Sequence, residues 1–341
     1  MMKNILYLGY YIKNLDKEKF RLFFDHVKKT KNISSVALMA DILSSSLKYK
    51  ISILEYFQFR FYDLTKADRK TYAGTGYMYE YQLAMNPKVH REILDNKISF
   101  YKKYARFVRH MAFGIEELMS NKELSAKLLT NPSGKIVLKD SVGKCGMQVK
   151  VFKTQYFEGK DLVSFMETEK FDLAEEFVTQ HPDIMALSPS ALNTVRVFTQ
   201  LNEKDEVEFL GARLRISVNS EVDNMAAGNI AAPIDINTGI IDGPGVYSDI
   251  TKEDAPVHPV TGVSIVGFQV PFWKEIIHMM KDSALHVKDN RSIGWDIAVT
   301  KDGPELIEGN HDWCKLVWQL PVKKGLKNIL ENHLANHSQH V

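Results

Sequence analysis

The distribution of glycine and proline is the feature that most constrains what this chain can fold into. The first 110 of the 341 residues contain only three of the 19 glycines and one of the 11 prolines. Because glycine and proline form turns and interrupt helices, their scarcity predicts long helices in this region. Residues 17–29 and 89–110 place apolar side chains three and four positions apart, the spacing of an amphipathic helix.

The remaining residues have a different texture, in which short β-rich segments alternate with Gly, Pro, Asn and Asp. Such segments predict strands separated by turns. A mostly helical front followed by this pattern predicts an α+β protein. The expected strands are 135–140, 147–152, 193–201, 206–217, 294–300 and 304–309, and the expected helices are 161–168 and 271–285.

Charge divides the chain at the same place. Residues 1–110 carry 21 Lys and Arg against 10 Asp and Glu, whereas the remainder carries 23 against 32. A basic, aromatic-rich helical module is suited to an anionic membrane surface or an acidic substrate. The alternative is a set of solvated helix faces around an aromatic core. The overall charge of +2 does not indicate a nucleic-acid binder.

Cysteine content and hydropathy bear on the compartment. Cys145 and Cys314 are the only cysteines, too few for a disulfide framework or a four-thiolate zinc site, which favours a reducing environment. No window reaches the roughly 18 apolar residues of a membrane span. We therefore expect a cytoplasmic protein without a transmembrane segment.

Residues 135–152 predict a glycine-rich hairpin. The first strand ends at Lys139, and the turn holds Gly143, Lys144 and Gly146. Glycines let backbone N–H groups approach a phosphate, and a lysine on the adjoining strand offsets nucleotide charge. The motif lacks the features of a P-loop, so an ordinary hairpin turn is the alternative.

The segment LAEEFVTQHP places Glu175 and Glu176 before Phe177 and Val178. Such a segment fits a hinge whose backbone pairs with an adenine edge while apolar side chains enclose the ring. A surface helix with exposed glutamates is an equal alternative.

The segment GWDIAVTKDGPELIEGN contains the strongest set of candidate ligands. Alternation along a strand puts Glu308 and Asn310 on one face, and Asp296 lies within an apolar run. Together they offer the oxygen ligands that Mg²⁺ prefers. Solvated carboxylates on a polar hairpin are the alternative, which their apolar sequence surroundings disfavour.

Arginines on two predicted strands accompany these acidic residues. Arg196 lies in NTVRVFTQ, and Arg213 and Arg215 stand two apart in GARLRIS, hence on one face. The planar guanidinium fork suits a triphosphate, a carboxylate or a developing acyl phosphate. Cross-strand or surface ion pairs are the alternative.

The order of these motifs resembles the ATP-grasp superfamily. The segments SALNTVRVFTQ and GWDIAVTKDGPELIEGN resemble more closely its sugar-transfer-associated family, whose members accompany surface-polysaccharide genes. The resemblance covers roughly residues 90–320. It implies ATP held between two α+β lobes with one or two Mg²⁺ ions, Mn²⁺ being the alternative metal. It further implies a ligase that forms an acyl phosphate for attack by an amine.

The resemblance also implies residue roles. Lys139 and residues 143–146 would bind phosphates, and residues 175–178 would form the hinge. The expected metal ligands are Asp296, Glu308 and Asn310, and the arginines that stabilise the phosphate and acyl phosphate are Arg196 and Arg213 or Arg215. An acidic ribose ligand is not evident after the hinge, and Asp183 is the possible substitute.

Charge and composition set apart a basic helical module over residues 1–110, which differs from the usual first domain of such ligases. The resemblance implies a small nucleotide-binding lobe over 111–184 and a metal- and phosphate-binding lobe over 185–341. The expected substrates are a small carboxylate and an amine, with a glycan or lipid-linked sugar as a further partner and peripheral membrane contact through the basic module. Competing functions are a phosphotransferase acting on a hydroxyl and a non-catalytic assembly module of a glycan-synthesis complex.

Overall fold

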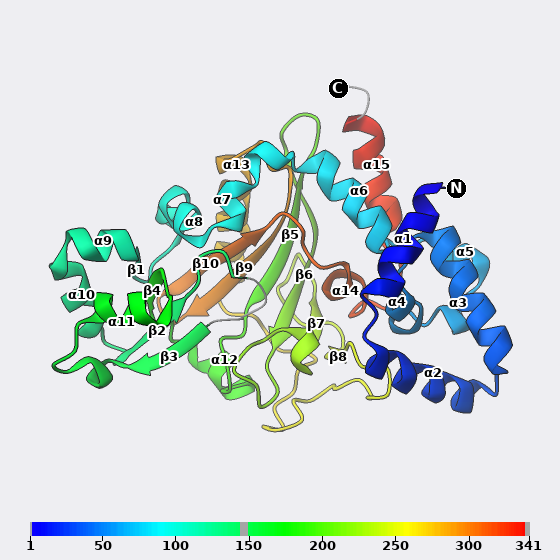
Figure 1. Ribbon diagram of the computed structural model, residues 1–341, viewed down its shortest axis with the longest axis horizontal. Helices are drawn as coiled ribbons and strands as arrows, with labels where there is room; N and C mark the ends of the chain where they lie inside the picture. The colour runs from blue at the N-terminus through cyan, green and yellow to red at the C-terminus, as the bar shows by residue number, and fades with distance from the viewer. Residues whose placement is uncertain (1, 144–148, 338–341) are drawn as a thin grey trace.

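The structure is a computed structural model, and it describes residues 2–143 and 149–337. Figure 1 shows a large central sheet, with the first helices on one side of it and a small sheet on the other. The helices before residue 111 are α1 (Met2–Lys13), α2 (Lys17–Lys31), α3 (Ser35–Tyr49), α4 (Ile53–Gln58), α5 (Lys66–Lys70), α6 (Thr75–Met85), α7 (Glu92–Asp95) and α8 (Lys97–Lys103).

Side-chain caps set the starts of several front helices. Asp16 accepts a hydrogen bond from the backbone N–H of Lys19 (3.0 Å) at the start of α2, the usual role of an N-cap aspartate. Ser52 and Glu55 form a capping box at the start of α4. The predicted helix over residues 17–29 is confirmed by α2.

The prediction of one continuous helix over residues 89–110 is wrong. This segment contains α7, α8 and two 3₁₀ turns, Lys88–His90 and Ala105–Phe107. Asn96 separates α7 from α8, because its backbone is extended and its side chain accepts a hydrogen bond from the N–H of Ser99 (3.0 Å). Asparagine favours such a cap over a helix interior, and the apolar spacing did not reveal this.

The described strands form two antiparallel sheets. The small sheet has the order β1-β4-β2-β3, and the large sheet has the order β10-β9-β5-β6-β7-β8. Their bounds are β1 (Ala112–Gly114), β2 (Lys135–Lys139), β3 (Val149–Lys153), β4 (Leu173–Glu176), β5 (Val195–Leu201), β6 (Val207–Ile216), β7 (Ile230–Ile234), β8 (Val246–Tyr247), β9 (Ser292–Thr300) and β10 (Gly303–Asn310).

Helices flank both sheets. Those beside the small sheet are α9 (Ile115–Ser120), α10 (Lys122–Leu129) and α11 (Leu162–Glu169). Those beside the large sheet are α12 (Pro182–Leu187), α13 (Trp273–His286) and α14 (Lys315–Gln319), whereas α15 (Lys327–His337) packs against α6. The predicted α+β class is confirmed.

The front helices share a core with the large sheet. Tyr56 and Phe61 belong to the same buried cluster as Phe198 of β5 and Trp318 of α14. The Gln319 side chain adds two hydrogen bonds, to the backbone N–H and C=O of Ala73 (3.0 Å each). The helical front is therefore joined to the sheet by a continuous apolar contact.

A second part of the front lies over the opposite core. Phe100 and Tyr104 of α8 belong to the cluster that contains Trp295 of β9, and the rings of Tyr104 and Trp295 meet edge to face at 5.5 Å. The boundaries at residues 110 and 184 remain predictions, and α12 spans the second. Within the described ranges, every helix is too short or too polar to cross a bilayer.

Candidate active site

Neighbouring strands of the large sheet carry charged side chains to one face. Arg196 of β5 lies opposite Asp296 of β9 and, on its other side, opposite Arg213 of β6. Arg215 follows two residues later on β6 and reaches the same carboxylate. Side chains of paired residues point to the same face of a sheet, so the register assembles this cluster.

A β-bulge in β10 brings Glu308 into the cluster. Leu306 pairs with Ile297, whereas Glu308 pairs with the adjacent Asp296, which leaves Ile307 as the extra residue. In a regular ladder Ile307 would lie opposite Asp296, and Glu308 would point to the other face. The bulge therefore determines which side chain meets Asp296.

Asp296 is 3% exposed and accepts three hydrogen bonds from arginines. Arg196 donates through Nε (2.5 Å) and Nη2 (2.7 Å), and Arg215 donates through Nη1 (2.8 Å). Arg215 also forms an ion pair with Asp223. Burial opposes ionisation of Asp296, but the two guanidinium groups outweigh it and hold the pKa of this carboxyl well below its usual range.

Glu308 and Asn310 continue this polar face. The Asn310 amide donates to Glu308 Oε1 (3.1 Å) and to the Gly294 carbonyl (3.3 Å). Burial, followed by the nearby Asp296 carboxylate, raises the pKa of Glu308. Two carboxylates that compete for ionisation form an environment that a divalent cation would stabilise, so the donors fit Mg²⁺.

The predicted metal set consists of two carboxylates and one amide side chain. Among residues 2–143 and 149–337, no group of three His, Cys, Asp or Glu side chains is arranged to hold a metal ion. Both Asp296 oxygens accept arginine hydrogen bonds in this geometry. The metal assignments for Asp296, Glu308 and Asn310 remain predictions.

A cavity of about 650 Å³ opens between the small sheet and the large one. Its walls include Lys139 of β2 and the whole predicted hinge, residues 175–178. Val149 and Val151 of β3 line it from the small sheet, and Ile307 lines it from the large one. A mostly apolar cleft with a few convergent polar groups is typical of a small-molecule site.

A buried network holds the lysine of this cavity. Lys139 forms an ion pair with Glu175, whose Oε1 accepts a hydrogen bond from the Tyr101 hydroxyl (2.9 Å). Burial opposes the charge of Glu175, but Lys139 and His110 outweigh it and lower the pKa of Glu175. The strand β4 therefore turns Glu175 inward, and the alternative of a surface helix with exposed glutamates is wrong.

The charged cluster forms part of the wall of a second cavity, of about 550 Å³. Arg196, Arg215, Glu308 and Asn310 line it together with residues of the front helices. The front contributes Lys19 of α2, Ser52 to Gln58 around α4, and Leu94 to Phe100 around α7 and α8.

The model of the sugar-transfer-associated ATP-grasp family matches residues 77–334, most of the chain. The protein belongs to this family. The resemblance drawn from the sequence is therefore confirmed, and so is the ATP-grasp fold. A search of curated proteins found no match.

Solved ATP-grasp structures are similar to this family member at low identity. The ligase PsnB with a minimal precursor has 10% identity and a TM-score of 0.45, covering 74% of this chain and 63% of PsnB. The D-alanine–D-alanine ligase from Coxiella burnetii has 10% identity and a TM-score of 0.41, covering 73% and 59%. An L-amino acid ligase from Bacillus licheniformis has 13% identity and a TM-score of 0.40, covering 71% of this chain and 48% of the ligase. The chain thus spans less than two thirds of the length of each.

One acidic residue that the sequence reasoning missed lines the same cavity as the predicted hinge. Asp183, the predicted ribose ligand, is not among the residues that line this cavity, and its carboxylate lies 3.5 Å from Nδ1 of His181. Glu221 lines that cavity instead, from the segment after β6. No local pattern marks Glu221, because only the folding of this segment brings it beside the hinge.

The remaining predicted residues separate into three groups. Gly143 lines the second cavity, and its carbonyl accepts a hydrogen bond from Lys97 Nζ (2.6 Å). Lys144 and Gly146 lie outside the described residues. Arg213 shares a face with Arg215 but donates to backbone carbonyls of Trp318 and Ala212, and burial lowers the pKa of its guanidinium to about 10. Of the two alternatives, only Arg215 reaches the Asp296 carboxylate.

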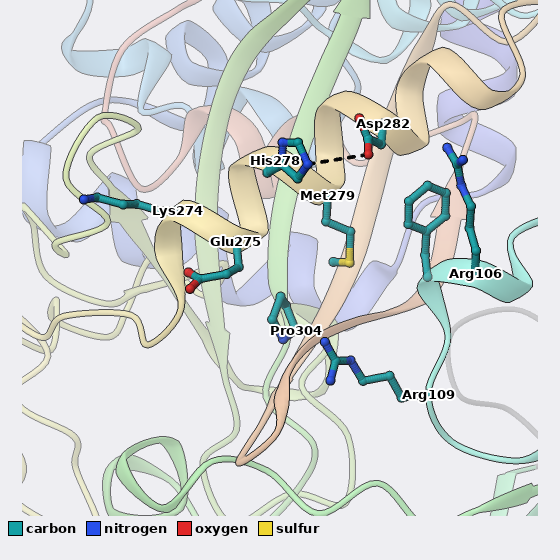
Figure 2. A pocket seen from close by; sticks show the side chains of 9 residues that line it. Arg106, Arg109, Lys274, Glu275, His278, Met279, Asp282 and Pro304 are labelled. Atoms are coloured by element: carbon teal, nitrogen blue, oxygen red, sulfur yellow. Dashed lines mark ion pairs between the residues drawn. The ribbon is translucent and has the colours of Figure 1, made fainter.

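A third hollow, of about 510 Å³, lies between α13 and the turn that begins β10 (Figure 2). Its charges are mixed in sign, with His278 3.8 Å from Asp282 and Arg109 donating to the Asp302 carbonyl. No described residue among those predicted from the sequence lines it. It therefore stands apart from the candidate active site.

Proposed function

We propose that this ATP-grasp protein is an ATP-dependent carboxylate–amine ligase that works through an acyl phosphate. One observation carries the proposal: adjacent residues of β10 line two different cavities. Ile307 lines the nucleotide cavity, and the next residue, Glu308, lines the second cavity together with Arg196 and Arg215. A group transferred from one cavity to a substrate in the other would pass these guanidinium groups.

The chain's own residues then have distinct tasks. Residues 175–178 hold the adenine end of ATP, and Lys139 moves from Glu175 to the phosphates. Arg196 and Arg215 face the transferring phosphoryl group, where fixed positive charge stabilises the transition state. Glu308 and Asn310, with Asp296, would hold Mg²⁺, which would neutralise phosphate charge.

The acceptor cavity supplies the second half of the reaction. A substrate carboxylate placed beside Arg196 and Arg215 would attack the terminal phosphorus of ATP, giving an acyl phosphate and ADP. An amine then attacks the acyl carbon, forming the C–N bond and releasing phosphate. Enclosure between the front helices and the large sheet would protect the reactive acyl phosphate from water. The family is described as sugar-transfer associated, and on that basis we place the reaction in surface-polysaccharide synthesis or modification.

The test compares the protein with its Glu308→Gln variant. We expect MgATP to raise the melting temperature of the wild type, and ADP release to require a carboxylate and an amine together. Glu308→Gln keeps the size of the side chain but removes its charge, so turnover should fall at least about 100-fold with the fold intact.

The exposed Glu253 supplies the matched control, and Glu253→Gln should retain wild-type turnover. ADP release with a hydroxyl acceptor alone would favour the phosphotransferase instead. Wild-type turnover in Glu308→Gln would refute the assignment, and no thermal shift with millimolar MgATP would refute the proposed function.

A further inference from the structure

The acceptor cavity continues outward into a groove. A smaller hollow of about 130 Å³ adjoins it, and both are lined by Lys19, Met225, Ala226 and Ser248. Because they share four lining residues, the two hollows are adjacent, and we refer to them together as the groove. It runs from the charged cluster, where Glu308 and Asn310 lie, toward the surface between α2 and the segment that follows β8.

Lysines line the part of this groove away from the arginines. Lys19 comes from α2 and lines both hollows, Lys315 begins α14 and lines the inner one, and Lys252 lines the outer one. Lys19 is exposed, and within the described part of the chain no ion pair holds its ammonium group. Lys252 lies 4.7 Å from the Tyr247 ring.

Lys315 is held in place by a buried carboxylate. Its ammonium lies 2.9 Å from Oε1 of Glu55, which is 2% exposed. Glu55 also accepts hydrogen bonds from the N–H of Ser52 (2.7 Å) and from the N–H (3.0 Å) and hydroxyl (2.7 Å) of Thr75. Burial disfavours the charged lysine, but Glu55 outweighs it and raises the pKa of Lys315. The ammonium thus stays charged. It has three N–H donors, of which the contact with Glu55 uses one.

The acidic side chains along the groove have partners of their own. Asp95 lies 2.9 Å from Nε2 of His311, and Asp249 accepts hydrogen bonds from the backbone (3.0 Å) and hydroxyl (2.7 Å) of Thr251. These contacts direct the two carboxylates to protein donors. The lysines are therefore the charged donors best placed to meet a ligand in the outer groove.

We propose that the acceptor substrate carries, besides its reacting carboxylate, a second anionic group, a phosphate or a carboxylate, that Lys19 and Lys315 bind. This proposal rests on the proposed function, which puts the reacting carboxylate beside Arg196 and Arg215. It gives the front helices a role in the reaction, because α2 supplies Lys19 and α4 supplies the carboxylate that positions Lys315.

Calorimetric titration of the full chain with a non-hydrolysable ATP analogue and Mg²⁺ tests this. The ligands are D-glucuronic acid, with one anionic group, and D-glucuronic acid 1-phosphate and galactaric acid, with two. We expect a two-anion ligand to bind at least about tenfold more tightly than D-glucuronic acid, and the tighter of the pair identifies the anion as phosphate or carboxylate.

Lys19→Gln should abolish this preference without changing the affinity for D-glucuronic acid. Lys17→Gln, an exposed lysine of the same helix outside the groove, should behave as wild type. Lys19 is exposed, so its variant should fold, whereas replacement of Lys315 would leave Glu55 buried without its cation.

The proposal would be overturned by the absence of a preference for two anions in the wild type, or by a preference that survives Lys19→Gln. Failure of all three acids to bind while MgATP still raises the melting temperature would also overturn it, leaving the proposed nucleotide chemistry intact. Loss of MgATP binding itself would overturn the proposed function, and this proposal with it.

Discussion

Replacement of Asp296 by asparagine should strongly destabilise the nucleotide-free protein. The carboxylate neutralises two guanidinium groups through three hydrogen bonds of 2.5–2.8 Å. Arg215 keeps its ion pair with Asp223, but Arg196 loses the carboxylate that it holds with two of those bonds. Removing one partner of a buried ion pair costs about 3–5 kcal/mol. Because asparagine retains one acceptor oxygen, we expect a loss near the lower limit, about 3 kcal/mol.

Urea denaturation followed by circular dichroism measures this loss, without ATP or Mg²⁺ so that ligand binding adds nothing. The midpoint should fall while the slope stays constant, as expected when only stability changes. Asp302→Asn, in the exposed turn before β10, is the matched control and should change stability by less than about 0.5 kcal/mol. A loss below about 1 kcal/mol for Asp296→Asn would show that Asp296 is not the charge that neutralises Arg196.

Two further predictions concern stability elsewhere. Burial opposes the charge of Glu305, but its hydrogen bond with His110 (2.8 Å) and two backbone N–H bonds outweigh it and lower the pKa of Glu305. A carboxyl group whose pKa is lowered by folding stabilises the fold above its unfolded pKa of 4.5, and this contribution is lost as the pH falls through the lower, folded pKa. Chemical denaturation between pH 6 and 3 should therefore show that the free energy of unfolding of Glu305→Gln falls less steeply than that of the wild type. An equal fall would contradict this. A Cβ on Gly325 would lie 2.2–2.4 Å from atoms of Thr71, including its backbone, so Gly325→Ala should lower the melting temperature by several degrees. Gly9→Ala is the control and should not lower it, because a Cβ there would have no atom within 4 Å. Equal melting temperatures for the two variants would refute the packing argument.

Sequence patterns predicted β5, β6, β9 and β10 of the large sheet but missed its strands β7 and β8. The predicted strands 193–201 and 294–300 correspond to β5 and β9, because β-branched and aromatic runs bounded by turn residues are a local signal. The inward position of Asp296 was predictable for the same reason, since a carboxylate within an apolar run must find partners.

Other features depend on contacts that no local pattern encodes. Arg213 and Arg215 share a face by alternation, but only the docking of α14 places the Trp318 carbonyl against Arg213. Lys315 meets Glu55 across 260 positions of sequence, and the amphipathic spacing around Asn96 concealed a helix end. Long-range packing and side-chain competition for backbone groups account for these differences.

The extra residue in β10 also limits how this hairpin can change. The turn at residues 301–302 lies outside the ladder, so lengthening the hairpin there would leave the pairing of Glu308 with Asp296 undisturbed. Deleting Ile307 would leave Glu308 opposite Asp296 in a regular ladder, but it would remove the β10 side chain that lines the cavity of about 650 Å³. The polar pair Glu308 and Asn310 could therefore be grafted onto a regular hairpin, whereas the cavity wall requires the irregular backbone. A one-residue deletion at Ile307 should alter the shape of that cavity and leave the charged pairing in place.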